Sequence, residues 1–158
     1  KRMVDYGSQV LLSTLDLEPD KTLLDVGCGY GPLGLTLGKV FGVQATLIDI
    51  NSRALDLARA NAEKNQVKAR IFQSNIYEEV EGNFDYIVSN PPIRAGKSVV
   101  HEIIKGAFRH LEDQGSLTIV IQKKQGAPSA KAKMEEVFGN CQILKKDKGY
   151  YILESVKE

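Results

Sequence analysis

The chain has 158 residues, of which 42% are hydrophobic and 26% are charged, a composition typical of one soluble globular domain. Its formal net charge of +1 excludes a general electrostatic attraction to nucleic acid, so such a partner would have to be recognised by a local basic patch. No apolar run approaches membrane-spanning length and no signal peptide is visible, which predicts no membrane partner.

The two cysteines, Cys28 and Cys141, are too few for a disulfide framework. We expect both to be reduced, which favours a cytoplasmic location. The chain begins at Lys1 and Arg2 rather than at a methionine. We therefore expect residues 1–158 to form a single domain that lacks a short N-terminal segment.

Apolar periodicity and turn residues predict alternating helices and strands. Asp5 is expected to cap a first helix that ends near residue 14, and Ser52 to cap a later one. Further helices are predicted at 33–41, 52–62, 99–111 and 128–139, with a polar loop at 122–128. Strands are predicted at 23–26, 45–50, 69–73, 84–89, 117–121, 142–146 and 150–154. This order predicts an α/β fold with a doubly wound, mostly parallel seven-stranded sheet and an antiparallel C-terminal hairpin.

A glycine-rich loop separates the first predicted strand from the next helix. Glycines at alternate positions let the backbone turn sharply and let a ligand approach without a Cβ in the way. The helix that follows then points its N-terminus at that ligand. The predicted ligand contacts in this loop are Asp25, Gly27, Cys28, Gly29 and Gly31.

Two classes of ligand fit this loop. Gly29, Gly31 and Gly34 satisfy the G-x-G-x-x-G dinucleotide pattern. The stretch from Asp25 to Gly31 also resembles the D-x-G-x-G-x-G loop of class I S-adenosylmethionine-dependent methyltransferases, in which the acidic residue handles the methionine ammonium. A carboxylate beside a pyrophosphate would bring like charges together. Asp25 therefore favours S-adenosylmethionine over a dinucleotide.

Further ligand contacts are expected where the neighbouring strands end, because ligands of a doubly wound sheet bind outside the carboxyl ends of its strands. Asp49 ends the second predicted strand, and its carboxylate can accept both hydroxyls of a ribose. A helix cap or a surface charge is the alternative interpretation. Ile50 is expected to pack on the adenine. Asn75, with Ile76 beside it, follows the third strand and can accept a hydrogen bond from the adenine amino group, unless these residues form an ordinary loop.

Asn90, Pro91, Pro92 and Ile93 follow the fourth predicted strand directly. Consecutive prolines make a rigid corner that cannot continue into a helix. The side-chain oxygen of Asn90 and the carbonyl of Pro91 can accept the two N–H groups of an amide-like amine and turn its lone pair toward a methyl donor. The sequence predicts a catalytic corner that acts by positioning and electrostatics, without a strong base.

The chain resembles the small-domain class I methyltransferases, the group that contains the bacterial small-subunit ribosomal RNA guanine-N2 methyltransferases. Four segments carry the resemblance: residues 4–8, 24–31, 89–97 and 121–127. It implies S-adenosylmethionine as donor, an exocyclic amino group as acceptor, and a place for residues 5–8 near the cofactor. Relatives that methylate bases commonly carry an aromatic residue where this chain has Ile93, so a stacking contribution of ~1–3 kcal/mol is lost or supplied elsewhere.

Arg94, Lys97, Lys123 and Lys124 are expected beside the pocket, where they would contact the phosphates of RNA. Solvated surface lysines are the plain alternative. Two other functions use the same motifs: methylation of a protein glutamine, and S-adenosylmethionine binding without catalysis in a ribosome-associated module. No metal site is predicted, because His101 and His110 would lie on opposite sides of one helix.

Overall fold

The computed structural model describes residues 6–92 and 94–158. The helices are α1 Tyr6–Thr14, α2 Pro32–Phe41, α3 Ser52–Lys64, α4 Lys97–Arg109 and α5 Lys123–Phe138. The strands are β1 Thr22–Val26, β2 Gln44–Asp49, β3 Ala69–Gln73, β4 Phe84–Ser89, β5 Leu111–Gln122, β6 Gln142–Asp147 and β7 Tyr150–Val156. None of the described helices is long and apolar enough to cross a membrane.

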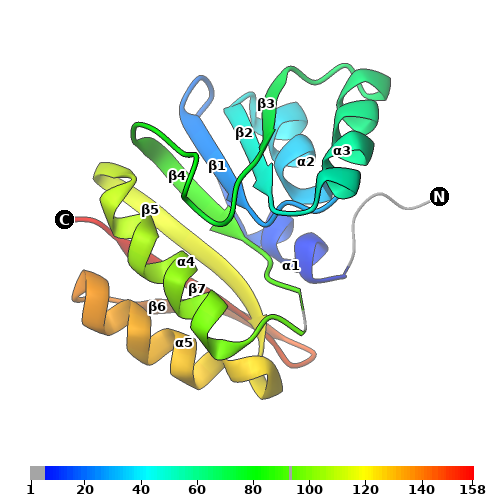
Figure 1. The fold of residues 1–158 in the computed structure, drawn as a ribbon. Helices are drawn as coiled ribbons and strands as arrows, with labels where there is room; N and C mark the ends of the chain where they lie inside the picture. The colour runs from blue at the N-terminus through cyan, green and yellow to red at the C-terminus, as the bar shows by residue number, and fades with distance from the viewer. Residues whose placement is uncertain (1–5, 93) are drawn as a thin grey trace.

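The strands form one sheet in the order β3-β2-β1-β4-β5-β7-β6 (Figure 1). The pairs among β1 to β5 are parallel, whereas β7 runs antiparallel to both β5 and β6. The predicted seven-stranded, doubly wound sheet with an antiparallel C-terminal hairpin is therefore confirmed. Because β1 to β4 are mutually parallel, their carboxyl ends lie along one edge of the sheet.

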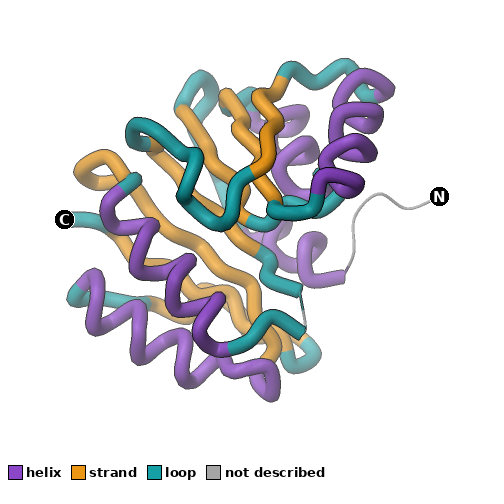
Figure 2. Tube along the Cα trace, viewed as in Figure 1, coloured by secondary structure: helices purple, strands orange, loops and turns teal. Residues whose placement is uncertain are grey.

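Helices cover both faces of the sheet, as Figure 2 shows. One core contains side chains from α1, α2 and α3, and the other contains side chains from α4 and α5. Successive side chains of β1 pack alternately into the two cores, because side chains alternate between the two faces of a strand. Leu23 is fully buried in the first core and Leu24 in the second. This double burial explains why β1 is an apolar run rather than an alternating one.

The structure corrects the predicted cap of α3 and the predicted start of α5. The predicted cap Asp5 lies outside the described residues. The cap of α3 is Asn51 rather than Ser52, because the Asn51 side chain accepts hydrogen bonds from the backbone N–H groups of Arg53 and Ala54. In the predicted polar loop at 122–128, Gln122 ends β5 and α5 begins at Lys123, with a non-helical residue at Gly126 where two helical segments meet.

The early start of α5 has a local cause. Gln122 and Gln125 form a capping box, in which each side chain accepts from the other residue's backbone N–H. Gly126 then has φ 126° and ψ 30°, which kinks the helix before Pro128 and so accommodates a proline in mid-helix. Lys123 and Lys124 consequently lie in a helical turn rather than in a loop.

Candidate active site

A cavity of about 430 Å³ lies at the carboxyl ends of β1 to β4. Most of the residues that the sequence predicts as ligand contacts line it: Asp25, Gly27, Cys28, Gly29, Asp49, Ile50, Asn75, Ile76, Asn90, Pro91 and Pro92. Ser8 of α1 also lines the cavity, as do Val99 and Ile103 of α4, which the sequence placed only within a predicted helix. Ile93 lies outside the described residues.

The glycine loop turns away from β1 through left-handed backbone conformations. Gly27 and Gly29 have φ values of 72° and 60°, which favour glycine over other residues. The N–H groups of Gly27 and Cys28 both donate to the carbonyl of Ile48 at 2.9 Å, which ties the loop to β2. A Cβ at Gly27 or Gly29 would meet no atom within 4 Å, so the backbone conformation accounts for these glycines.

Gly31 has a different place from the other predicted contacts, because it does not line the cavity. It is buried, and a Cβ there would lie 2.9 Å from Leu35 Cδ1 and 3.2 Å from Leu47 Cδ2. Its φ of 96° also lies in the left-handed region. The geometry gives Gly31 a packing role between the loop and the sheet.

Asp25 is a buried carboxylic acid in the wall of the cavity, with 1% of its surface exposed. Its Oδ2 accepts a hydrogen bond from the Gly34 N–H at 2.9 Å. The pKa of Asp25 is raised from 3.8 to about 7: burial is the main cause and the nearby charge of Asp49 adds to it, whereas the Gly34 hydrogen bond opposes the shift. A cationic group entering the cavity would favour the ionised form of this acid.

Asp49 uses both carboxylate oxygens to shape the site. Its Oδ2 accepts from the Gly29 N–H at 2.8 Å, and its Oδ1 accepts from the Asn51 N–H at 2.9 Å. Asp49 therefore links the glycine loop to the start of α3. Each carboxylate oxygen can accept more than one hydrogen bond, so these contacts leave capacity for a ligand hydroxyl.

The side of the cavity at the ends of β2 and β3 carries apolar and amide groups. Ile50 exposes 60% of its surface although it lines the cavity. Asn75 is exposed, and its Nδ2 donates to Glu78 at 3.5 Å. Ile76 has a φ of 56°, which is rare for a β-branched residue. Backbone strain of this kind concentrates at functional sites, and here it lies in the cavity wall.

Asn90, Pro91 and Pro92 form a rigid turn after β4, here called the Asn90 corner. Helix α1 contacts this corner on one side. Asn90 Nδ2 donates to the hydroxyl of Ser8 at 3.1 Å, and Ser8 is itself buried. Gly7 packs beside them. A bulky side chain would not fit at this position, because a Cβ there would lie 3.1 Å from Tyr150 and 3.5 Å from Asn90. Tertiary packing thus brings residues 7 and 8 to the corner, in the segment that the family resemblance places near the cofactor.

Gln125 of α5 contacts the same corner and was not identified from the sequence. Its side-chain Nε2 donates to the carbonyl of Pro92 at 2.8 Å and to that of Pro91 at 3.3 Å. The spacing of Gln122 and Gln125 is a capping-box signal, and it could have indicated a helix start at this point. It could not have indicated contact with residues more than thirty positions earlier.

Neither cysteine is an activated nucleophile. Burial raises the pKa of the Cys28 thiol and also that of Cys141, so both favour the neutral form. Both are free, and Cys28 contributes a small side chain to the cavity wall. Within residues 6–92 and 94–158, no group of three or more His, Cys, Asp or Glu side chains is arranged to hold a metal ion.

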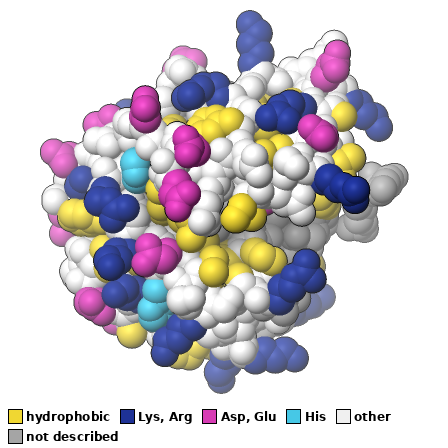
Figure 3. All heavy atoms as spheres, in the orientation of Figure 1, with side chains coloured by type: hydrophobic (Ala, Val, Ile, Leu, Met, Phe, Trp, Pro, Cys, Tyr) yellow, Lys and Arg dark blue, Asp and Glu magenta, His cyan; other side chains and the backbone are white. Residues whose placement is uncertain are grey.

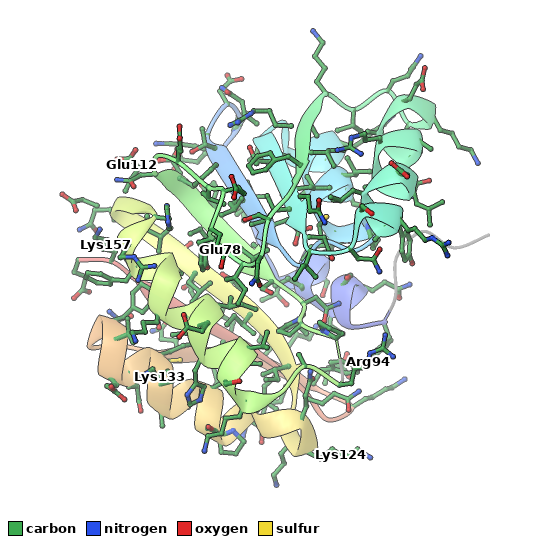
Figure 4. The ribbon with its side chains drawn as sticks, viewed as in Figure 1. Glu78, Arg94, Glu112, Lys124, Lys133 and Lys157 are labelled. Atoms are coloured by element: carbon green, nitrogen blue, oxygen red, sulfur yellow. The ribbon has the colours of Figure 1, made fainter. Side chains whose placement is uncertain are left out.

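Four side chains were predicted to contact RNA, and all four are exposed: Arg94 and Lys97, which follow β4, and Lys123 and Lys124, which follow β5. Figure 4 shows Arg94 on the loop before α4 and Lys124 at the start of α5, on the same side of the molecule. Figure 3 shows Lys and Arg side chains along this lower right border. Lys123 and Lys124 line a groove of about 620 Å³ together with Lys148 of the β6–β7 turn.

Comparisons with known proteins identify methyltransferases among the proteins that are similar to this chain. A family model described as "Methyltransferase small domain" matches residues 1–154. An uncharacterized protein of Bacillus subtilis, YbxB, is 47% identical over 99% of this chain and 81% of its own length. Ribosomal RNA small subunit methyltransferase C of Erwinia tasmaniensis is 35% identical over 98% of this chain.

A similar solved structure is a 16S rRNA N2 methyltransferase of T. thermophilus, in complex with AdoMet and guanosine. It superposes with a TM-score of 0.89 at 27% identity over 98% of this chain. The match covers 44% of that protein and 46% of the Erwinia relative, so this chain spans less than half the length of either rRNA methyltransferase.

Proposed function

Because the chain belongs to the methyltransferase small domain family, we propose that it transfers a methyl group from S-adenosylmethionine to the exocyclic N2 amino group of a guanine in ribosomal RNA. The observation that carries this proposal is the convergence of Asn90 and Pro91 with Asp25 and Asp49 on one cavity. Acceptor-positioning groups and donor-binding groups are thereby close enough to serve one reaction. The relatives named as rRNA methyltransferases support the choice of acceptor.

The residues around the cavity suit the three parts of S-adenosylmethionine. The buried Asp25 carboxylate would attract its ammonium group, and Asp49 would accept hydrogen bonds from its ribose. Ile50 and Ile76 would pack against its adenine, and the amide of Asn75 would accept from the adenine amino group. When bound, the cofactor supplies an electrophilic methyl group, which the acceptor nitrogen takes up with its lone pair while sulfur keeps the bonding pair and one proton leaves to water.

The Asn90 corner would orient the acceptor amine. Because the amide nitrogen of Asn90 is engaged by Ser8, its oxygen is the atom that would accept one amine N–H. The Pro91 carbonyl would accept the other. These two contacts would turn the amine lone pair toward the methyl group, and such preorganised contacts contribute about 10²–10³ in rate each.

The basic groove would hold the RNA strand beside the target base. Lys123, Lys124 and Lys148 form none of the ion pairs found among the described residues, and the Lys148 ammonium lies 5.4 Å from the centre of the Tyr6 ring, a contact that leaves its charge unneutralised. Arg94 and Lys97 add charge at the start of α4. Such a rim would attract phosphates even though the whole chain is nearly neutral.

A labelled methyl donor tests this function when it is offered with guanosine, ribosomal RNA and a protein mixture. We expect labelled methyl groups to appear in guanosine, and to be transferred more efficiently to ribosomal RNA. Label only in protein would instead support methylation of a glutamine side chain. Binding without any transfer would support a non-catalytic module.

The role of the groove is tested by replacing Lys123 and Lys124 with Gln. RNA binding should weaken, and its dependence on salt should flatten by about one unit for each lost phosphate contact. Replacement of Lys64 and Lys68, which are exposed at the far edge of the sheet, removes the same charge and should leave the salt dependence unchanged. Equal effects of the two double variants would refute a local RNA site.

A further inference from the structure

Gln125 connects the start of α5 with the Asn90 corner through both ends of its side-chain amide. The Nε2 atom donates to the carbonyls of Pro92 and Pro91, at 2.8 and 3.3 Å. The Oε1 atom accepts from the backbone N–H of Gln122 at 3.3 Å. The amide is thus fixed by the helix cap on one side while it holds two consecutive carbonyls on the other.

These contacts complete a restraint that proline alone leaves open. The rings of Pro91 and Pro92 fix φ at both residues, and Pro92 also restricts the ψ of Pro91 to the extended region, but no ring fixes the ψ of Pro92 or the exact ψ of Pro91 within that region; ψ sets the direction of each carbonyl. The Pro92 carbonyl also accepts from the Ala95 N–H at 2.8 Å. Gln125 therefore narrows the backbone freedom that the double proline retains: it holds the Pro91 carbonyl within its extended range and the Pro92 carbonyl, whose ψ no ring restricts.

We propose that Gln125 is a positioning residue for methyl transfer, which fixes the Pro91 carbonyl in the direction that receives the acceptor N–H. This inference rests on the proposed function for the identity of the acceptor. A carbonyl oxygen has two lone pairs, so the hydrogen bond from Gln125 leaves one for the acceptor amine. The capping box keeps the Gln125 amide in place without any contribution from the substrate.

The substitution Gln125→Glu isolates the donated hydrogen bonds. A glutamate still accepts from the Gln122 N–H, so the helix cap remains, but it loses the Nε2 donor and places negative charge beside two carbonyls. We expect kcat on guanosine to fall about 10- to 100-fold, the loss that is typical when a group that orients a metal ligand is removed. The dissociation constant for S-adenosylmethionine should stay within about twofold. Gln125→Met, which is neutral and of similar length, should give the same loss if the glutamate destabilises the fold.

The pH dependence separates positioning from general damage. A protonated glutamate can donate an O–H, so the kcat of Gln125→Glu relative to wild type should rise as the pH falls from 8 toward the ordinary pKa of Glu, about 4.3. Gln125→Met has no titrating group and should show no such rise. Gln44→Glu is the matched control, because Gln44 also donates to a backbone carbonyl, that of Asp20 at 3.1 Å, at the opposite end of the sheet.

Hydrogen exchange gives a readout that does not depend on activity. Exchange of the Ala95 amide, whose acceptor is the Pro92 carbonyl, should accelerate in Gln125→Glu and Gln125→Met but not in Gln44→Glu. An unchanged kcat together with unchanged Ala95 exchange would overturn the inference. If the wild-type protein methylates none of the substrates, the proposed function fails, and Ala95 exchange still decides whether Gln125 positions the corner.

Discussion

Asp25 predicts a pH dependence of cofactor binding that can be calculated from the structure. With a pKa of about 7, its ionised fraction is about 3% at pH 5.5 and about 50% at pH 7.0. If the ammonium of S-adenosylmethionine binds only the carboxylate, the affinity should rise about 15-fold between these two pH values, which is ~1.6 kcal/mol. An α-amino group, with a pKa of about 7.7–8.0, stays mostly protonated in this range.

Calorimetry with two ligands and two proteins tests this calculation. Methylthioadenosine keeps the adenosine part but has no ammonium, so its affinity should change much less over the same range. The Asp25→Asn variant can still accept from the Gly34 N–H, but it has no charge to gain and should bind S-adenosylmethionine weakly at both pH values. A 15-fold change that persists in Asp25→Asn, or that also occurs with methylthioadenosine, would refute the assignment.

The same buried acid predicts how folding stability depends on pH. The folded-state pKa of about 7 lies above the ordinary value of 3.8, so the contribution of Asp25 is fully present below pH 3.8 and is lost as the pH rises through 7. The difference corresponds to at most ~4 kcal/mol. In urea unfolding, Asp25→Asn should therefore gain stability relative to wild type as the pH is raised from 5 to 8; a constant difference would show that Asp25 does not titrate in this range.

Three further variants probe the remaining parts of the site. Asn90→Ala should lower kcat about 10²–10³-fold and leave cofactor affinity within a few-fold; normal turnover would assign acceptor positioning to other groups. Asp49→Ala should weaken S-adenosylmethionine binding by roughly 1.5–3 kcal/mol, and calorimetry that detects no loss would place the ribose elsewhere. Gly34→Ala should lower the free energy of unfolding by about 1–3 kcal/mol, because its Cβ would lie 2.9 Å from both Asp25 Oδ2 and Leu47 Cδ1; an unchanged urea midpoint would contradict this packing.

The sequence predicts the sheet and most of the cavity wall because parallel strands impose a simple geometry. β3 and β4 have the predicted bounds, since each is a run of extended residues between turn residues. Once the strands are placed, their carboxyl ends must share one edge. Asp49 and Asn90 could therefore be predicted to lie near Asp25 although they are distant in the chain.

The parts that could not be predicted depend on contacts between distant segments. Residues 122–128 contain glycine and proline and are polar, which locally favours a loop. The capping box of Gln122 and Gln125 instead starts a helical segment at Lys123, and the non-helical Gly126 joins it to the segment that contains Pro128. The carbonyl of Gly149 accepts from the Lys123 N–H at 2.9 Å, and this contact between the hairpin and α5 brings Lys148 to the groove. Sequence periodicity carries no information about such a pairing.

Gly34 explains why the loop formally matches two different ligand patterns. In the dinucleotide pattern the third glycine is required for close packing between helix and strand. Gly34 has that role here, since its missing Cβ makes room for Leu47 of β2 and for the Asp25 carboxylate. Close packing of a helix on the sheet is needed whichever ligand binds, so this glycine does not distinguish a pyrophosphate from an ammonium. The distinction lies with Asp25, whose buried carboxylate would repel an anion and attract a cation in the same place.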